Sequence, residues 1–150
     1  MAHFLHQHYT ILNTRLIKTD IVNTDTEAEN LKVLIVDDEM DICYLLRGIL
    51  SRHSLHPYYV NTLYEAATDL EREIPSVVFL DNHLPDGLGI DFIKHIKSHY
   101  PSVKIALITA IDSTANKELA YKNGADFFIS KPFRRETIFK VVNSIGHHPN

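Results

Sequence analysis

From Leu31 onward, short runs rich in β-branched residues alternate with stretches whose apolar residues have helical spacing. This alternation is typical of βα units arranged around a parallel sheet. Five such units joined by right-handed crossovers predict an α/β fold with a doubly wound five-stranded parallel sheet and helices on both faces. We expect strands at Lys32–Val36, Pro57–Asn61, Ser76–Leu80, Lys104–Ile108 and Ala125–Ile129. The first, third and fourth are almost continuously apolar, as strands covered on both faces must be.

The stretches between the strands predict helices. Thr62 and Glu65 have the spacing of a capping box at the start of the second helix, and Pro101 should end the third. The fourth helix, about residues 113–123, should be the least firmly anchored, because it can bury few apolar residues: Ala115, Leu119, Ala120 and Tyr121. Cys43 is the single cysteine and lies within the apolar pattern of the first helix, so we expect a core residue and no disulfide framework or cysteine-based zinc site.

The composition excludes several classes of function. A net charge of −4 over 150 residues gives no broad basic field, so direct binding to nucleic acid is not expected. No apolar run reaches the roughly 20 residues of a membrane span, and the N-terminus lacks the order of a secretory signal. We therefore expect a cytoplasmic protein with no membrane insertion.

Residues 1–30 differ from the rest of the chain in being polar and rich in threonine and asparagine. They predict a mobile or partly ordered N-terminal extension, with one strand or helix from Tyr9 to Ile17. His3, His6 and His8 could contribute to a metal site, although the sequence supplies no defined fourth ligand.

Polar residues follow four of the five expected strands. Asp37 and Asp38 come after the first strand, Asp81 after the third, Thr109 after the fourth and Lys131 after the fifth. In an open parallel sheet the functional crevice lies beyond the carboxyl ends of the strands. We therefore expect three carboxylates, a hydroxyl and an amine to converge on one rim.

Three clustered carboxylates repel one another unless a cation offsets their charge. Oxygen ligands with open water positions suit Mg²⁺. Leu34 to Asp41 contains no glycine, so the dinucleotide fingerprint and the Walker loop are both absent. A cation ringed by acids, with Lys131 and Thr109 nearby, is suited to a small phosphoryl group, and Asp81 is the best candidate for a nucleophile.

The segments "VDDE", "VVFLDNHLPDGLG", "ALITA" and "FFISKPF", in this order and spacing, resemble the receiver domain of two-component response regulators, in its single-domain form. The resemblance covers about residues 31–146 and implies a flavodoxin-like receiver fold over residues 31–147. It implies that Asp81 accepts a phosphoryl group from a sensor histidine kinase or a histidine phosphotransfer protein. The cofactor would be Mg²⁺, bound directly by Asp38, Asp81 and the backbone carbonyl of His83, with Asp37 acting mainly through water.

The resemblance also implies roles for the remaining motif residues. Lys131 would pair with Asp81 or its phosphoryl oxygens, and Thr109 would donate its hydroxyl to the phosphoryl group. Thr109 and Phe128 would form a switch that changes the surface of the fourth helix, fifth strand and fifth helix, where an unknown downstream protein target binds. Pro132 would follow a cis peptide bond, and Gly87 or Gly89 would adopt a positive φ.

Local features qualify the resemblance. His83 should tune how fast water attacks the aspartyl phosphate. Arg134 stands where a helix-capping residue is expected. The switch surface is locally basic, which fits either an acidic partner or a solvated face; its basic residues are Lys117, Lys122, Lys131, Arg134 and Arg135.

Two other functions stay open. A Mg²⁺-dependent phosphatase of the haloacid dehalogenase kind also uses an aspartate nucleophile, but places it after the first strand with a second acid two residues on, unlike "VDDEMD". A degenerate receiver serving as a binding scaffold would not need the intact acid set. We expect a phosphoryl acceptor with Mg²⁺-dependent autodephosphorylation, no separate enzymatic turnover and no output domain after Gly146.

Overall fold

The computed structural model describes residues 9–12, 15–18, 31–51 and 55–145. Within these ranges lies one five-stranded sheet with the strand order β4-β3-β5-β8-β9, and every neighbouring pair is parallel. Its strands are β3 (Leu31–Val36), β4 (Leu55–Val60), β5 (Val77–Asp81), β8 (Lys104–Thr109) and β9 (Phe127–Ser130). The predicted doubly wound α/β fold is confirmed.

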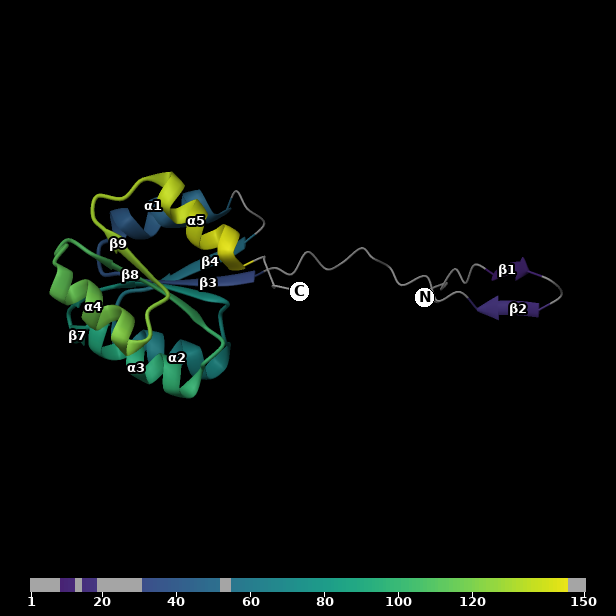
Figure 1. The fold of residues 1–150 in the computed structure, drawn as a ribbon, viewed down its shortest axis with the longest axis horizontal. Coiled ribbons are helices and arrows are strands. Elements are labelled where there is room, and N and C mark those ends of the chain that lie inside the picture. Colours follow the sequence, from purple (N-terminus) through teal and green to yellow (C-terminus); the bar gives the residue numbers. More distant parts are fainter. Residues whose placement is uncertain (1–8, 13–14, 19–30, 52–54, 146–150) are drawn as a thin grey trace.

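Helices cover both faces of this sheet (Figure 1). On one face lie α1 (Met40–Leu50) and α5 (Arg135–Ile145), and on the other lie α2 (Leu63–Arg72), α3 (Gly89–His99) and α4 (Thr114–Asn123). Alternate residues of each buried strand supply the two cores. Ile35 and Phe79 belong to the core under α1 and α5, and Leu34 and Leu80 to the core under α2, α3 and α4. The continuous apolar runs therefore reflect burial on both faces.

The strand boundaries differ from the predicted ones by one or two residues, and the differences occur at both ends of the strands. Asp81 and Thr109 are themselves strand residues, because the pairing continues to Asp81 with Ile108 and to Thr109 with Ser130. The second core strand begins at Leu55, which pairs with Leu31, and the fifth begins only at Phe127. Backbone pairing, rather than the apolar pattern, sets these ends.

The helix ends follow the local signals in the sequence. Thr62 accepts a hydrogen bond from the Glu65 N–H (3.1 Å), and Glu65 accepts one from the Asn61 N–H (2.8 Å), one residue earlier than in the usual capping box. The third helix ends at His99, before Pro101. Of the four residues predicted to anchor α4, only Ala120 is buried, while Leu119 and Tyr121 are 41% and 45% exposed.

Ala115, Leu119 and Tyr121 are therefore not core residues, and α4 buries even fewer apolar side chains than its sequence offers. Asn123 takes part of the anchoring role instead, because its buried side-chain amide donates to the Ile90 carbonyl (2.9 Å) and ties α4 to α3. A polar contact of this kind leaves no trace in an apolar pattern.

The N-terminal extension contains two short strands, β1 (Tyr9–Leu12) and β2 (Arg15–Lys18), which pair antiparallel. The expectation of one strand or helix from Tyr9 to Ile17 is therefore wrong, because the segment pairs with itself. His3, His6 and His8 lie outside the described residues. None of the helices in the described part of the chain has both the length and the apolar composition needed to cross a membrane.

Candidate functional site

Three carboxylates meet at the carboxyl edge of the sheet. Asp37 and Asp38 follow β3, and Asp81 ends the neighbouring strand β5. One carboxylate oxygen from each residue lies within 4.8 Å of the others. Asp37 and Asp81 are buried, at 1% and 4% exposure, whereas Asp38 is exposed. Since the chain leaves β3 toward β4 on one side and returns to β5 on the other, the cluster lies where the winding direction reverses, the usual crevice of such sheets.

The Lys131 ammonium lies among these acids. Its Nζ is 3.1 Å from Asp81 Oδ1, 3.4 Å from Asp37 Oδ2 and 3.1 Å from Glu39 Oε1. Lys131 follows β9, two strands away from β5, and its long side chain spans that distance. The predicted convergence of Lys131 with the acids is present in the structure.

The electrostatics of the cluster reflect burial and mutual repulsion. Burial raises the pKa of Asp37 to about 6, and repulsion from Asp81 adds to this effect, while a hydrogen bond from the Glu39 N–H and the charge of Lys131 oppose it. Burial also raises the pKa of Asp81, again opposed by Lys131. Burial alone would lower the pKa of Lys131, but Asp37 and Asp81 outweigh it and raise that pKa. One ammonium therefore only partly offsets the carboxylate charge.

Asp37 is held by contacts to both its side chain and its backbone. Its Oδ1 accepts from the Glu39 N–H (2.8 Å), and its carbonyl accepts from Asn61 Nδ2 (2.8 Å) and from Cys43 Sγ (3.3 Å). The predicted core position of Cys43 on α1 is confirmed, since its side chain is buried in the core between the sheet and the helices α1 and α5. The carboxylate is thus fixed in place before any ligand binds.

The loop between β5 and α3 approaches the Asp81 backbone closely. A Cβ at residue 89 would collide with the Asp81 carbonyl, so Gly89 is required by space, while Gly87 adopts the positive φ of +154°. The Asn82 side chain accepts from the Ile90 N–H (2.9 Å) at the start of α3. His83 begins the two-residue strand β6 (His83–Leu84), which pairs with β7 (Gly87–Leu88), and its side chain is exposed.

The predicted switch residues lie on β8 and β9, two adjacent strands on one side of the same sheet. Thr109 is buried at the end of β8, and its Oγ1 accepts from the Ile111 N–H (3.1 Å). Phe128 on β9 is half-buried and packs against the core on the side of α2, α3 and α4. The Lys131–Pro132 peptide bond is cis, as the resemblance implies.

Three polar residues of this region were missed by the sequence reasoning. Glu39 forms an ion pair with Lys131, and the only indication of this in the sequence is its position next to Asp37 and Asp38. Asn61 follows β4 directly, so the strand-end rule should have selected it. Asp86 accepts from the backbone N–H groups of Leu63 and Tyr64 (2.9 Å each), which lower its pKa and tie the β5–α3 loop to the start of α2.

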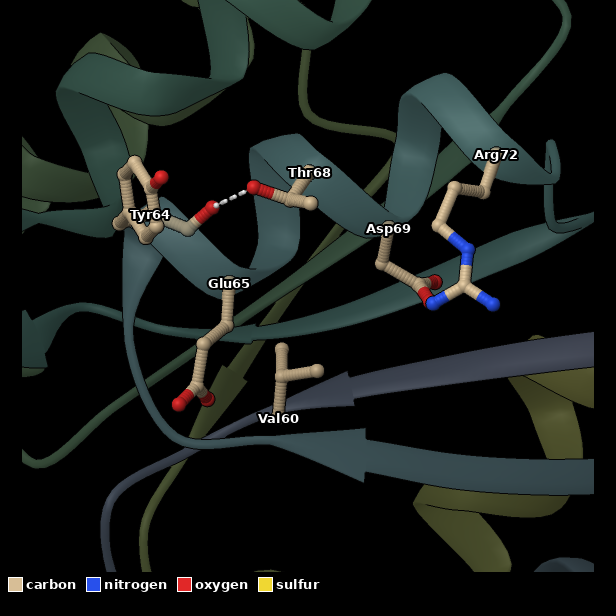
Figure 2. A pocket seen from close by; sticks show the side chains of 6 residues that line it. All are labelled: Val60, Tyr64, Glu65, Thr68, Asp69 and Arg72. Atoms are coloured by element: carbon tan, nitrogen blue, oxygen red, sulfur yellow. Dashed lines mark hydrogen bonds between the residues drawn. The ribbon is translucent and has the colours of Figure 1, made fainter.

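Two cavities lie near these elements. One of about 310 Å³ opens beside Lys131 and is lined mainly by apolar side chains, those of Ile42, Leu45, Pro132 and Phe133. The other, of about 250 Å³, lies between α2 and the end of β4 (Figure 2) and contains none of the candidate site residues. Its lining is Val60, Tyr64, Glu65, Thr68, Asp69 and Arg72. Only the first cavity adjoins the carboxylate cluster.

Comparison with known proteins places this geometry in a family. Residues 33–143 match the family model of the response regulator receiver domain. The chain is 40% identical over 101 residues to the response regulator protein PilR of Pseudomonas aeruginosa, an alignment that covers 67% of this chain and 23% of PilR. It is 28% identical over 116 residues to the phosphate regulon transcriptional regulatory protein PhoB of Escherichia coli, covering 76% of this chain and 51% of PhoB. The chain thus spans about half or less of the length of these two relatives.

Solved structures agree with the sequence matches. The beryllofluoride-activated receiver domain dimer of NtrC4 superimposes with a TM-score of 0.73 at 35% identity, covering 76% of this chain and 94% of that one. The residues matched by the family model, 33–143, include the whole five-stranded sheet apart from the first two residues of β3. On these grounds the chain belongs to the family of response regulator receiver domains, the phosphoryl-accepting modules of two-component signal transduction.

Proposed function

We propose that Asp81 is the phosphoryl acceptor of this receiver, and that a sensor histidine kinase or a histidine phosphotransfer protein is the donor. The observation that carries the proposal is the contact of Lys131 Nζ with Asp81 Oδ1 (3.1 Å) inside a cluster of three carboxylates. Asp81 ends the central strand β5, which is paired on both sides by β3 and β8. We propose residues 31–147 as the receiver domain, residues 1–30 as an extension, and the cytoplasm as the location.

The donor set fits Mg²⁺. Three carboxylate oxygens within 4.8 Å of one another are hard ligands. Burial raises the pKa values of Asp37 and Asp81 although Lys131 opposes it, so a bound cation would stabilise the ionised carboxylates further. We propose Asp38, Asp81 and the His83 carbonyl as direct ligands, with Asp37 acting mainly through water. When bound, the ion supplies charge neutralisation between the acids and the incoming phosphoryl oxygens.

Phosphoryl transfer then depends on positioning. An Asp81 carboxylate oxygen attacks the phosphorus of the phosphohistidine, the P–N bond breaks, and its electron pair returns to the imidazole nitrogen, which takes up a proton. The product is an aspartyl phosphate. Lys131 holds the attacking carboxylate and then a phosphoryl oxygen, and the rigid support of Asp37 keeps the cluster in register. The apolar cavity beside Lys131 is the surface we propose for donor approach.

We propose that Thr109 and Phe128 carry the signal outward. Thr109 Oγ1 accepts a hydrogen bond from the Ile111 N–H. The Thr109 hydroxyl can also donate a hydrogen bond, so it can bind a phosphoryl oxygen. A shift of Thr109 would change the space available to Phe128 between β9 and α4, and so the surface of α4, β9 and α5. Exposed basic residues lie on α4, at the start of α5 and just before it, which favours an acidic downstream protein; they are Lys117, Lys122, Arg134 and Arg135.

The test uses phosphoramidate, a small donor with a P–N bond, together with Mg²⁺. The proposal predicts a mass gain of one phosphoryl group per chain, loss of that gain in Asp81→Asn, and no steady hydrolysis of p-nitrophenyl phosphate. Steady hydrolysis of that ester by the native chain, abolished by Asp37→Asn, would favour the phosphatase instead. Absence of any mass gain while Mg²⁺ binds would favour the scaffold.

A further inference from the structure

The exposed surface of α3 carries two histidines one helical turn apart. His95 and His99 have i, i+4 spacing, which puts both side chains on the same face of the helix. Their ring centres are 4.4 Å apart and the ring planes are tilted by 34°. Both side chains are exposed, and neither belongs to the carboxylate site. Two imidazoles this close on one helix face form a pair that a single ion can bridge.

The distance between the ring centres indicates which coordination geometry is within reach. A metal–nitrogen bond of about 2.1 Å places an ion roughly 3.2 Å from the centre of an imidazole ring, so two rings bound at a right angle have centres about 4.5 Å apart. A tetrahedral angle would require about 5.2 Å. The observed 4.4 Å is closer to the right-angled value, and rotation of the two exposed side chains has to turn the nitrogen lone pairs, which lie in the ring planes, toward one ion. Ions that favour right-angled nitrogen ligands are Cu²⁺ and Ni²⁺.

The surroundings hold the two rings in place. His95 stacks on Phe92, with ring centres 5.2 Å apart and planes within 13°. The Nδ1 of His99 lies 2.9 Å from the His95 carbonyl, which can only accept, so Nδ1 carries the proton and Nε2 keeps its lone pair. A backbone carbonyl that accepts from the second ring nitrogen is the usual outer partner of a metal-bound histidine.

We propose that His95 and His99 form a bidentate site for a divalent transition-metal ion of the Cu²⁺ or Ni²⁺ kind on α3. Water completes the coordination, because within the described part of the chain the group of three or more close metal-ligating side chains is Asp37, Asp38 and Asp81. The site is independent of the phosphoryl acceptor, which takes a hard ion through oxygen ligands.

The test is isothermal titration of the full chain with NiCl₂ in excess Mg²⁺, which occupies the carboxylates. The background carries Gln at the other clustered histidines of the sequence, namely His3, His6, His8, His147 and His148. We expect one Ni²⁺ per chain, with affinity lowered at least about tenfold by either His95→Gln or His99→Gln, because each removes the chelate. His56→Gln, an exposed histidine on β4, is the matched control and should leave the affinity unchanged.

Three outcomes would overturn the proposal: no binding in this background, retention of full affinity in either single variant, or an equal loss in His56→Gln. Circular dichroism of each variant checks that α3 is intact, which is expected because both positions are exposed. Electron paramagnetic resonance with Cu²⁺ gives a second readout. The background should show coupling to two ring nitrogens and each single variant to one; coupling to one nitrogen in the background would contradict the chelate.

Discussion

Replacement of Asp37 by Asn should stabilise the metal-free fold. Burial and the neighbouring Asp81 hold the pKa of Asp37 at about 6, against an ordinary value of 3.8. The folded chain therefore binds a proton there more tightly than the unfolded chain does, so this stabilising contribution is present below pH 3.8 and is lost as the pH rises through 6. Above pH 6 the ionised carboxylate costs up to about 3 kcal/mol of folding free energy.

Asn at position 37 removes that charge and keeps the main contacts. Its side-chain oxygen can still accept from the Glu39 N–H, and the bonds from Asn61 and Cys43 go to the backbone carbonyl. Asp37→Asn should therefore raise the unfolding free energy at pH 7.5 without Mg²⁺ by about 1–3 kcal/mol. The difference from the native chain should shrink as the pH falls toward 4.

The assay is urea denaturation followed by circular dichroism, with EDTA and with excess Mg²⁺. Asp38→Asn is the matched control, because that carboxylate is exposed and its removal should change the metal-free stability by less than about 0.5 kcal/mol. With Mg²⁺ the native chain should gain stability and Asp37→Asn should gain less. A neutral or destabilising effect of Asp37→Asn in EDTA at pH 7.5 would refute the reasoning.

Three further predictions concern the same region. The apparent Mg²⁺ affinity, measured by calorimetry, should fall as the pH drops below about 6, because a proton on Asp37 competes with the ion; an affinity that is constant from pH 7.5 to 5 would contradict this. Lys131→Met should lower the metal-free unfolding free energy by on the order of 1–3 kcal/mol and slow the phosphorylation of Asp81, because it leaves Asp37 and Asp81 without their cationic partner. An unchanged unfolding free energy and an unchanged phosphorylation rate would count against the proposed role of Lys131. Gly89→Ala should lower the unfolding free energy, measured by urea denaturation, by about 1–3 kcal/mol, because the new Cβ collides with the Asp81 carbonyl. Gly48→Ala, at a position on α1 with open space around it, should raise the unfolding free energy by about 0.5–1 kcal/mol. Equal effects of the two substitutions would show that the collision at residue 89 is relieved.

The fold was readable from the sequence because each element carries its own signal. Continuous apolar runs such as residues 77–80 can be buried only under helices on both faces, and amphipathic stretches supply those helices. The exception is α4, whose apolar residues Leu119 and Tyr121 are exposed. It is anchored through Ala120 and the Asn123 amide, and a hydrogen bond to a distant carbonyl has no periodicity to detect.

The site was predictable wherever a polar residue follows the end of an expected strand. The acids and Lys131 were found in this way, since parallel strands present their carboxyl ends to one edge. Asn61 obeys the same rule and was overlooked because the second strand was predicted to include it, whereas β4 ends at Val60 and the Asn61 side chain binds the Asp37 backbone. Glu39 could not have been assigned, because its contact with Lys131 depends on the direction of two long side chains. Gly89 acts through the space it leaves beside the Asp81 carbonyl, which only coordinates reveal.

Chemical trapping of the phosphorylated residue tests the central claim most directly. Borohydride reduces an aspartyl phosphate to homoserine, and peptide mapping after incubation with phosphoramidate and Mg²⁺ then locates the modified position. The buried carboxylate at the end of β5, in contact with Lys131, predicts homoserine at position 81 alone. Homoserine at position 37 or 38, or at no position in a chain that has gained a phosphoryl group, would contradict it.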